Sequence, residues 1–598
     1  MDVTSLNFAE ISEGLCAAID GCDFCAIDCE MTGLNSSSGT KNSPSDNYQA
    51  RYLSVRDSAA KFLLLQYGIT TFKFDQTNNR YVCRPYNVYL FPHPPSLRPG
   101  DERDDARFLC QASSVSFLCQ HNFDFNKCFR HGVKHITLEY KLEKETAIRR
   151  KMEKDATPES SRSKVEIKRL QDQEFVDNCL SSVRTAKLAF EGDSAHDSFF
   201  VLPPTNGFRR RILYDAFSGE EFETVLLQKF AEDNESSRYG NQSLRAVFFS
   251  SVDDKSAFLE VKRRADMKEE LEKVKEESGF SRIIEALSNA KKTVVGHNCL
   301  LDLAHTYTKF CGAPPLEFEK YVTSLRSKFP SIVDTKYCVS NDKKLYPCFT
   351  STALGDVYAG VQGLENAKPD FVEAFRESSE VNVEFSAGFD RYKTAEFHHE
   401  AGYDSYMTGV VFLKLMLAKG YSPRDIRSLG ASESLDASFH NRLYLMRMGG
   451  RCIDLAGANP DPDRSNWLHV TGFPLEAQTH HIMNCFKPYK GKRVYWLDDE
   501  NLFVEFLDDD SFPELMGLVP STRKENETET EVTVRKSLVT LEMLSMQLFS
   551  DYIRIRTYGP KSSKRPAESQ NGREKRKRTK IAARGETSEE VAGGCCVQ

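Results

Sequence analysis

Two acidic residues alternate within a short apolar stretch near the start of the chain, FCAIDCEM. Successive side chains of a strand point to opposite faces, so Asp28 and Glu30 are expected to share one face of a strand over residues 24–31. Two buried carboxylates side by side repel each other unless a cation neutralises them. Hard divalent cations with oxygen ligands, chiefly Mg²⁺ with Mn²⁺ as a substitute, suit such a pair. The pattern therefore predicts a metal site.

Two more acids and a histidine extend this pattern. Asp302 starts an expected helix directly after the strand-like TVVGHN, and Asp404 lies in HEAGYDSYMTG at the mouth of an apolar helix. His399 precedes Asp404 by five positions, and an imidazole with an ordinary pKa of about 6.5 can take a proton from an attacking water. Singly, each acid is usually a helix cap or a surface charge. Together and in this order they form a much more specific pattern, because carboxylates of this kind can hold two metal ions that clamp a scissile phosphate.

Three other histidines lie close to these residues in the sequence. His398 does not keep the spacing to Asp404, so we expect it in a structural or solvent-facing role. His297 and His305 flank Asp302 and are expected as core or surface histidines rather than as ligands.

Composition divides the 598 residues into several parts. The stretches KFLLLQYGITTFKF and RYVCRPYNVYLFP predict a mixed sheet. Residues 139–169 and the stretch from Val261 are charged and lack a wide apolar stripe, as solvated connectors do. They bracket residues 165–252, which we expect to be an inserted domain. The expected parts are an α/β core split into 1–164 and 253–445, the insert 165–252, a small α/β module 463–558 and a disordered basic tail 559–598.

Bulk composition adds little about partners. The net charge of −7 does not indicate nucleic-acid binding, so any RNA affinity must come from local basic patches. No cationic leader and no run of about eighteen apolar residues is present, so we expect a soluble intracellular protein. The seventeen cysteines are an odd number and are scattered, which is typical of reduced thiols. Cys22 and Cys25 form a lone CxxC and are expected as packed thiols.

The order D-x-E, then G-H-N-x-x-x-D, then H-x-x-x-x-D resembles the DEDDh exonucleases. The stretches LLLQYGITTFKFD, SFLCQHNFDFNKCFRHGV, GFSRIIEALSNAKKTVVGHN, IVDTKY and HHEAGYDSYMTG are similar to the DEDDh deadenylase family of poly(A)-specific ribonucleases, over roughly residues 1–560. This resemblance implies a 3′→5′ exoribonuclease that removes mRNA poly(A) tails and releases 5′-AMP, with two Mg²⁺ ions. Under it, Asp28, Glu30, Asp302 and Asp404 are the metal ligands and His399 is the general base.

The resemblance also implies an architecture and partners. The core would be an RNase H-like exonuclease domain, the insert a single-stranded nucleic-acid-binding domain of the Arg-His type, and the C-terminal module an RNA-recognition motif. The implied partners are poly(A) RNA, the 5′ 7-methylguanosine cap and a second copy of the chain in a homodimer. RNA contacts are implied at Lys336, at Leu34 and at Met31, which stands where the family has an aromatic residue.

Both tryptophans of the chain fall in the C-terminal module. The run Phe503-Val504-Glu505-Phe506 resembles the second half of the RNP1 signature, whose aromatic residues stack on bases. Trp467 is expected in the core. The acids Asp498 and Asp499 beside Trp496, together with the family resemblance, predict that Trp496 stacks on the cap, because a cationic purine binds favourably between an indole and an acid.

Basic clusters lie in the insert and in the tail. Arg209, Arg210 and Arg211 offer either phosphate contacts or a solvated face. The tail segment KRPAESQNGREKRKR has the form of a bipartite nuclear localisation signal, so we expect the protein in both nucleus and cytoplasm. The last four residues, CCVQ, match a prenylation box, and no membrane association is expected unless that cysteine is prenylated.

Two other functions remain open at the level of sequence. The run DCEMTGL is also similar to oligoribonuclease, which favours a general DEDDh exonuclease on short oligonucleotides, although the extra domains argue against it. A catalytically silent protein that binds the cap or poly(A) is the second alternative. The presence of all five catalytic residue types argues against silence.

Overall fold

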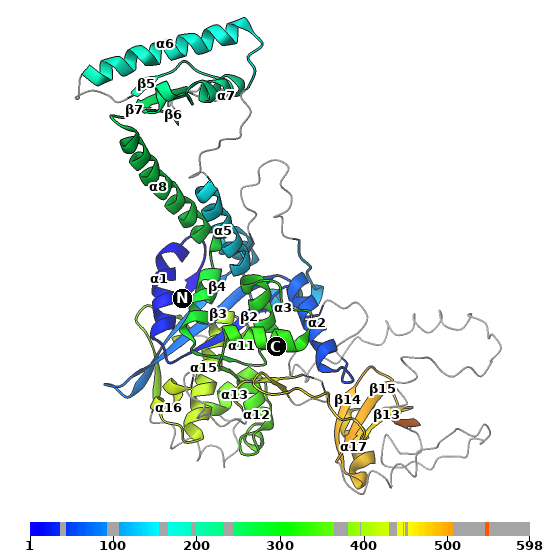
Figure 1. Cartoon of the computed structure of the whole chain (residues 1–598). Helices are drawn as coiled ribbons and strands as arrows, with labels where there is room; N and C mark the ends of the chain where they lie inside the picture. Colours follow the sequence, from blue (N-terminus) through cyan, green and yellow to red (C-terminus); the bar gives the residue numbers. More distant parts are fainter. Residues whose placement is uncertain are drawn as a thin grey trace, which may run out of the picture. The chain divides into compact units, whose positions relative to one another are not determined.

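The computed structural model of the chain describes residues 1–35, 43–92, 107–154, 165–192, 199–230, 243–363, 381–394, 396–429, 439–446, 448, 452–507 and 545–548 (Figure 1). The chain divides into two compact units. One combines Met1–Glu139 with Ser278–Gln598, and the other is Tyr140–Glu277. The predicted basic tail, 559–598, lies outside the described residues.

A seven-stranded mixed sheet forms the centre of the first unit, as the alternating stretches predict. Strand β2 (Phe24–Met31) lies inside it, antiparallel to β3 (Leu64–Asp75) and parallel to β8 (Thr293–Gly296), and all eight of its residues are buried. The strand order is β1-β4-β3-β2-β8-β9, with β10 also on β4. The remaining strands are β1 (Asp2–Val3), β4 (Arg80–Tyr89), β9 (Ile332–Asp334) and β10 (Asn382–Phe385).

Helices cover both faces of this sheet. Cys25, Ile27 and Cys29 of β2 pack against one set of helices: α1 (Phe8–Gly21), α2 (Tyr48–Lys61), α9 (Ser281–Ala290), α10 (Leu300–Thr306) and α11 (Phe318–Lys328). Phe24 and Ala26 pack against the other: α12 (Thr335–Asn341), α13 (Leu354–Val361), α15 (Ala401–Ala418) and α16 (Pro423–Ser428). By alternation, Asp28 and Glu30 lie on the same face of β2 as Phe24 and Ala26.

Helix α15 approaches the sheet closely. A Cβ at Gly68 of β3 would lie 1.8 Å from the carbonyl oxygen of Ala401, so only glycine fits there. The side-chain Oε1 of Gln66 accepts a hydrogen bond from the Ala401 N–H at 3.3 Å, which satisfies one of the free amides at the helix start. These contacts fix the first turn of α15, which carries Asp404.

Two short helices and a pair of short strands complete the core. Helices α3 (Ala112–Gln120) and α4 (Phe125–His131) follow the sheet strands, and their Leu118 and Cys128 pack on β3 and β4. Strands β11 (Arg442–Tyr444) and β12 (Cys452–Asp454) form an antiparallel pair.

Two expectations about the whole chain can be compared with the described residues. No helix among them is both long and apolar enough to cross a membrane. Cys22 and Cys25 are free thiols, and their sulfurs lie 3.3 Å apart.

The C-terminal module is a four-stranded antiparallel sheet in the order β14-β15-β13-β16, with helix α17 (Thr479–Phe486) on one face. Trp467 is buried and its ring stacks on Tyr495 at 4.5 Å, which confirms its place in the core. Phe503 of the RNP1-like run is also fully buried, so its ring is not exposed for stacking on a base. The strands are β13 (Trp467–Thr471), β14 (Gly491–Trp496), β15 (Asn501–Phe506) and β16 (Ser545–Leu548).

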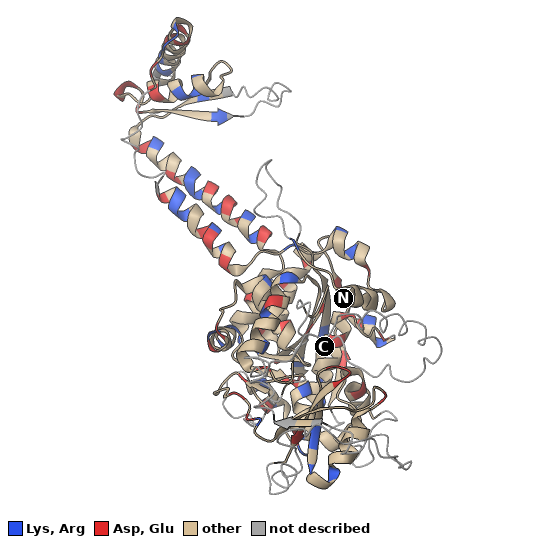
Figure 2. Cartoon of the chain, turned by 90° about the vertical axis from the view of Figure 1, so that its right-hand side faces the viewer, with Lys and Arg blue, Asp and Glu red and all other residues tan. Residues whose placement is uncertain are grey.

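The second unit holds a three-stranded sheet, β5-β7-β6, with helices α6 and α7 packed on it. The two charged arms that sequence composition predicts as connectors are helices α5 and α8, along which basic and acidic residues are interspersed (Figure 2). Lys144 of α5 pairs with Glu277 of α8 at 2.7 Å. The elements are α5 (Leu138–Lys154), α6 (Leu170–Gly192), β5 (Phe199–Val201), α7 (Gly207–Ala216), β6 (Val225–Phe230), β7 (Ser243–Phe248) and α8 (Val252–Ser278).

Candidate active site

The two acids of β2 are buried at the carboxyl end of the strand, with exposed fractions of 2% for Asp28 and 1% for Glu30. Asp28 pairs in register with Gly68, the residue on which α15 packs. The register of β2 against β3 shifts between Glu30 and Met31. Such irregularities often re-aim a side chain beside a site.

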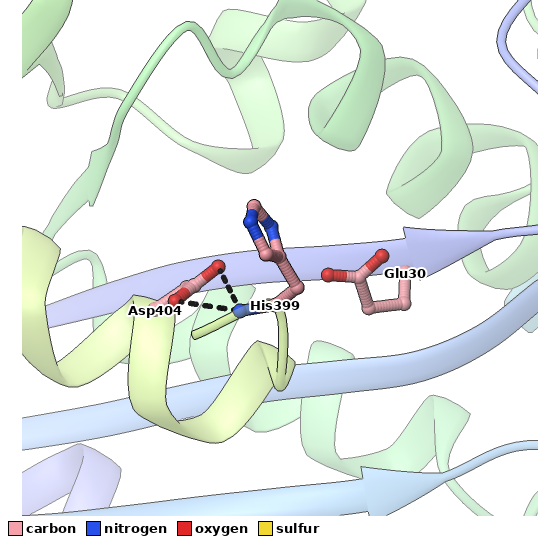
Figure 3. Close-up of side chains that lie close together, drawn as sticks. All are labelled: Glu30, His399 and Asp404. Carbon is pink, nitrogen blue, oxygen red and sulfur yellow. Dashed lines mark hydrogen bonds between the residues drawn. The ribbon is translucent and has the colours of Figure 1, made fainter. Parts of the chain in front are cut away.

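Glu30, His399 and Asp404 converge at this end of the sheet, with one potential ligand atom of each lying within 4.8 Å of the others (Figure 3). Glu30 comes from β2, His399 from the turn before α15, and Asp404 from the first turn of α15. The His399 N–H donates to both carboxylate oxygens of Asp404, at 3.2 and 3.4 Å. Residues far apart in the sequence thus form one cluster.

His399 has an unusual backbone conformation and an aromatic neighbourhood. Its φ of 66° lies in the left-handed region, which costs energy for a residue with a Cβ and often marks a functional site. Its ring lies 4.6 Å from the ring of Phe117 and 4.2 Å from that of His121, both in the segment around α3. These two rings hold the imidazole from one side.

Asp302 lies in the first turn of α10, directly after β8, and is 2% exposed. Its charge is one of the causes that raise the pKa of Glu30. Because β2 and β8 are parallel, their carboxyl ends meet at one edge of the sheet, which is how Asp302 reaches the acids of β2.

Burial dominates the electrostatics of the cluster. It raises the pKa of Asp302 to about 7 and that of Asp404 to about 8. Burial, together with the charges of Asp404 and Asp302, holds the pKa of Glu30 well above its usual range. Burial also lowers the pKa of His399 to about 4, and the neighbouring His121 and His398 act in the same direction. The acids therefore lack compensating positive charge, and the imidazole is neutral at pH 7.

Asp334, at the end of β9, positions several parts of the site. Its buried carboxylate accepts backbone N–H bonds from Asn298 at 2.8 Å, from Lys336 at 3.0 Å and from Tyr444 at 2.9 Å. Asn298 begins the turn that leads to Asp302. One carboxylate thus ties together the chain after β8, the start of α12 and strand β11.

Arg391 braces the turn that carries His399. Its guanidinium pairs with Glu400 at 2.6 Å and lies 4.7 Å from the centre of the Phe397 ring. Phe397 and Glu400 directly precede and follow the pair His398 and His399. The Arg391 side chain therefore contacts both ends of this turn. Asp2 pairs with the same guanidinium.

The other predicted residues fall in varied surroundings. Lys336 is buried in α12, and its ammonium lies 5.7 Å from the centre of the Tyr444 ring. Met31 is 5% exposed and packs in the apolar cluster with α2 and α10, and Leu34 packs against the same cluster. Trp496 is half-buried, and its Nε1 donates to Oγ1 of Thr479 at 2.9 Å.

The remaining histidines lie outside the cluster. His398 is exposed and pairs with Glu396 at 3.1 Å. His297 is buried, and its Nδ1 and Nε2 lie 2.9 and 3.0 Å from Thr335 Oγ1 and the Thr352 carbonyl oxygen. His305 is buried too, but neither ring nitrogen has a hydrogen-bond partner in the described part of the chain.

Two of the three consecutive arginines in α7 form ion pairs within the inserted unit. Arg209 pairs with Asp172 at 2.9 Å, and Arg211 lies 3.7 Å from Asp215. Arg210 donates to the carbonyl oxygen of Thr205 at 3.2 Å. All three side chains therefore have partners within the unit.

The model of the CAF1 family of ribonucleases matches residues 3–412. This range contains the acid cluster, which is Asp28, Glu30, Asp302 and Asp404, together with His399. The chain belongs to the CAF1 ribonuclease family. This family membership agrees with the predicted RNase H-like α/β core. The match stops before the C-terminal module, which begins near residue 463.

Curated relatives extend the likeness beyond the family match. The chain is 31% identical over 545 residues to the poly(A)-specific ribonuclease PARN of Xenopus laevis, covering 88% of this chain and 79% of that protein. It is 30% identical over 538 residues to human PARN, with 88% and 78% covered. It is 24% identical over 480 residues to the Bombyx mori pre-piRNA 3′-exonuclease trimmer, with 79% and 82% covered. A solved structure of Schizosaccharomyces pombe Pop2p is a distant match, with a TM-score of 0.33 and 12% identity over 74% of this chain and 98% of that one.

Sequence reasoning missed four residues of this CAF1-family site. Phe117 and His121 lie in SFLCQHNFDF, a stretch whose likeness to the family is visible but in which no residue spacing indicates contact with His399. Asp334 lies at the end of a strand, the same signal that singles out Asp302. Arg391 shows no signal, because its role depends on Phe397 and Glu400 meeting in space.

Proposed function

We propose that this chain is a 3′→5′ exoribonuclease that shortens mRNA poly(A) tails and releases 5′-AMP, using Mg²⁺ held by Asp28, Glu30, Asp302 and Asp404. The observation that carries the proposal is the convergence of Glu30, His399 and Asp404 on one buried, acidic point. The poly(A) substrate is supported by the names of the relatives, which are poly(A)-specific ribonucleases.

The donor set fits a hard divalent cation. Oε2 of Glu30 and Oδ1 of Asp302 are buried, and neither has a hydrogen-bond partner among the described residues. Buried carboxyl groups stay ionised at low cost only when they are paired or bound to a metal. When bound, two Mg²⁺ ions, or Mn²⁺ in their place, would activate the attacking water and neutralise charge on the phosphate and the leaving 3′ oxygen.

His399 is the general base in this proposal. It is neutral at pH 7 because burial lowers its pKa to about 4, so it can accept a proton. The hydrogen bonds from its N–H to Asp404 and the rings of Phe117 and His121 fix the imidazole in one place. The proton that leaves the attacking water goes to this ring. General-base help of this kind is worth about 10²–10⁴ in rate.

RNA contacts by Lys336, Met31 and Leu34 are part of the proposal. Lys336 follows β9 as Asp302 follows β8, so both lie at the same edge of the sheet. Competition between defined poly(A) and mixed-sequence oligomers tests the substrate. A preference for poly(A) supports a deadenylase, whereas equal rates on short mixed oligomers indicate a general exonuclease.

For the C-terminal module we propose an RNA-recognition motif that binds the 7-methylguanosine cap through Trp496. The four-stranded sheet with α17 against one face suits that module. Val494 and Trp496 lie on the α17 face and Tyr495 stacks on Trp467 on the other, which agrees with the alternation of β14. Trp496→Ala should weaken binding of a cap analogue about five- to a hundredfold while uncapped poly(A) is still degraded. Unchanged cap affinity would return Trp496 to a packing role.

Four further proposals concern partners and place in the cell. The inserted unit is proposed as a single-stranded nucleic-acid-binding domain of the Arg-His type. The protein is proposed as a homodimer, and sedimentation of the full chain tests this oligomeric state.

The proposal of nuclear and cytoplasmic localisation rests on the basic tail. Removal of residues from Lys564 onward should leave the enzyme active and shift it out of the nucleus. Detergent partition of protein from its own cells tests prenylation of the CCVQ end.

A further inference from the structure

A cavity of about 510 Å³ lies outside the acid cluster and plays no part in the proposed cleavage step. Ligand sites usually enclose about 300–1,000 Å³, so its size suits a bound group. Its walls come from the end of α12, the segment 346–352, strand β11 with the residues after it, and β14. The lining includes the aromatic side chains of Tyr346, Phe349, Tyr444 and Tyr495 and the guanidinium of Arg493.

The lining has the chemistry of a nucleotide site. Four of the side chains are aromatic, most of the others carry hydroxyl or amide groups, and none is an acid. Arg493 is exposed, and its guanidinium lies beside the hydroxyl of Tyr495, which also lines the cavity. Single-stranded nucleic acid is bound by this combination, because rings stack on bases and a guanidinium binds phosphate.

The cavity adjoins the residues that lead from the acid cluster. Lys336 lies four positions before Ser340 on α12, and its ammonium faces the Tyr444 ring at 5.7 Å. The carbonyl oxygen of Thr352 lies 3.0 Å from Nε2 of His297, which follows β8. The contacts of Lys336 and His297 thus connect the cavity to the carboxyl ends of β8 and β9, which Asp302 and Lys336 follow.

We propose that this cavity binds nucleotides on the 5′ side of the scissile bond, holding the body of the tail while its 3′ end is cleaved. The inference rests on the proposed exoribonuclease function and names a subsite for it. Tyr346, which is 60% exposed, stacks on a base, and Arg493 binds a backbone phosphate. A free mononucleotide such as the AMP product shares this chemistry, so the test must separate the two sources.

The test measures binding of the full-length protein to fluorescent oligo(A) of about twelve and of about three residues, in EDTA so that no cleavage occurs. Arg493→Gln should weaken binding of the long oligomer about fivefold, lower the slope of log K against log salt by about 0.7, and affect the short oligomer less. Tyr346→Ala should cost about five- to a hundredfold on the long oligomer, and Tyr346→Phe should restore most of that affinity. Lys487→Gln is the control, because it removes an exposed charge of the same module away from the cavity.

The outcomes separate the two proposals. If wild-type protein degrades oligo(A) in Mg²⁺ but Arg493→Gln binds like Lys487→Gln, the subsite is wrong and the proposed function stands. Equal losses on long and short oligomers, or a change only in inhibition by AMP, would also overturn the subsite, the latter because it assigns the cavity to a mononucleotide. Wild-type protein that neither binds nor degrades oligo(A) would overturn the proposed function itself.

Discussion

The backbone N–H of His399 lies 3.2 Å from Oδ2 of Asp404 and 3.4 Å from Oδ1. The proposed base and a proposed metal ligand are therefore held by one hydrogen-bonded turn. The left-handed φ of His399 makes this turn possible, and α15 fixes the position of Asp404 in its first turn. A change in the packing of α15 against the sheet should thus disturb base and ligand together.

Neutral replacements of the four acids should abolish activity without unfolding the protein. Asp28→Asn, Glu30→Gln, Asp302→Asn and Asp404→Asn each remove a proposed metal ligand. Burial raises the pKa values of Glu30, Asp302 and Asp404, and the charges of Asp404 and Asp302 raise that of Glu30 further. Because a neutral amide carries no charge to bury, the melting temperature should stay constant or rise. Rates on oligo(A) and thermal melting check this. Near-normal turnover in Mg²⁺ would remove that residue from the site.

Magnesium should stabilise the protein more as pH rises from about 6.5 to 8. The folded-state pKa values of about 7 for Asp302 and 8 for Asp404, against an ordinary 3.8, mean that these acids are protonated at the lower pH and compete with the metal. A raised pKa also means that metal-free stability from these groups is lost as pH rises through it. The gain in melting temperature on replacing EDTA with Mg²⁺ is the quantity to measure. Asp404→Asn should flatten its pH dependence, and a pH-independent gain in wild-type protein would contradict the assignment.

The two adjacent histidines should respond differently to substitution. His399→Ala should slow cleavage by about 10²–10⁴ and leave metal binding in place, because it removes the proton acceptor. His398→Ala is the matched control, since His398 is exposed and pairs only with Glu396 among the described carboxylates. Single-turnover rates on oligo(A) check both variants. The reverse pattern would mean that His398 is the base.

Gly68→Ala should lower both stability and activity. The added Cβ would lie 1.8 Å from the Ala401 carbonyl oxygen, so α15 must move away from the strand that pairs with Asp28. A loss of about 1–3 kcal/mol or more in the free energy of unfolding is expected. Gly14→Ala is the control, because a Cβ there meets nothing within 4 Å inside α1 and should raise stability by about 0.5–1 kcal/mol. An active, stable Gly68→Ala protein would show that α15 does not need this contact.

Much of the core could be predicted from sequence because local pattern and tertiary environment agree there. The strand expected over 24–31 is β2 to the residue, and the apolar helix that carries Asp404 is α15. Acids at strand ends are recognisable because parallel strands bring their carboxyl ends together. Buried Trp467 was also predicted correctly.

Other features depend on contacts that no local pattern encodes. The charged residues 138–154 and 252–278 are helices of a compact unit, although neither has an apolar stripe that would predict burial. Met31 lies in the core. The alternation of β2 therefore does not indicate the RNA contact that is predicted for this residue. The rings of Phe117 and His121 meet His399 only in space.

The central claim is tested most directly by incubating the purified protein with Mg²⁺ and a 5′-labelled RNA that carries a 3′ A-tail. We expect a ladder of products that shortens one nucleotide at a time from the 3′ end and stalls where the tail meets the body, with 5′-AMP as the released product and no ladder from Asp28→Asn. An RNA left intact by the wild-type protein, or cut internally, or degraded through its body at an undiminished rate, would contradict the account.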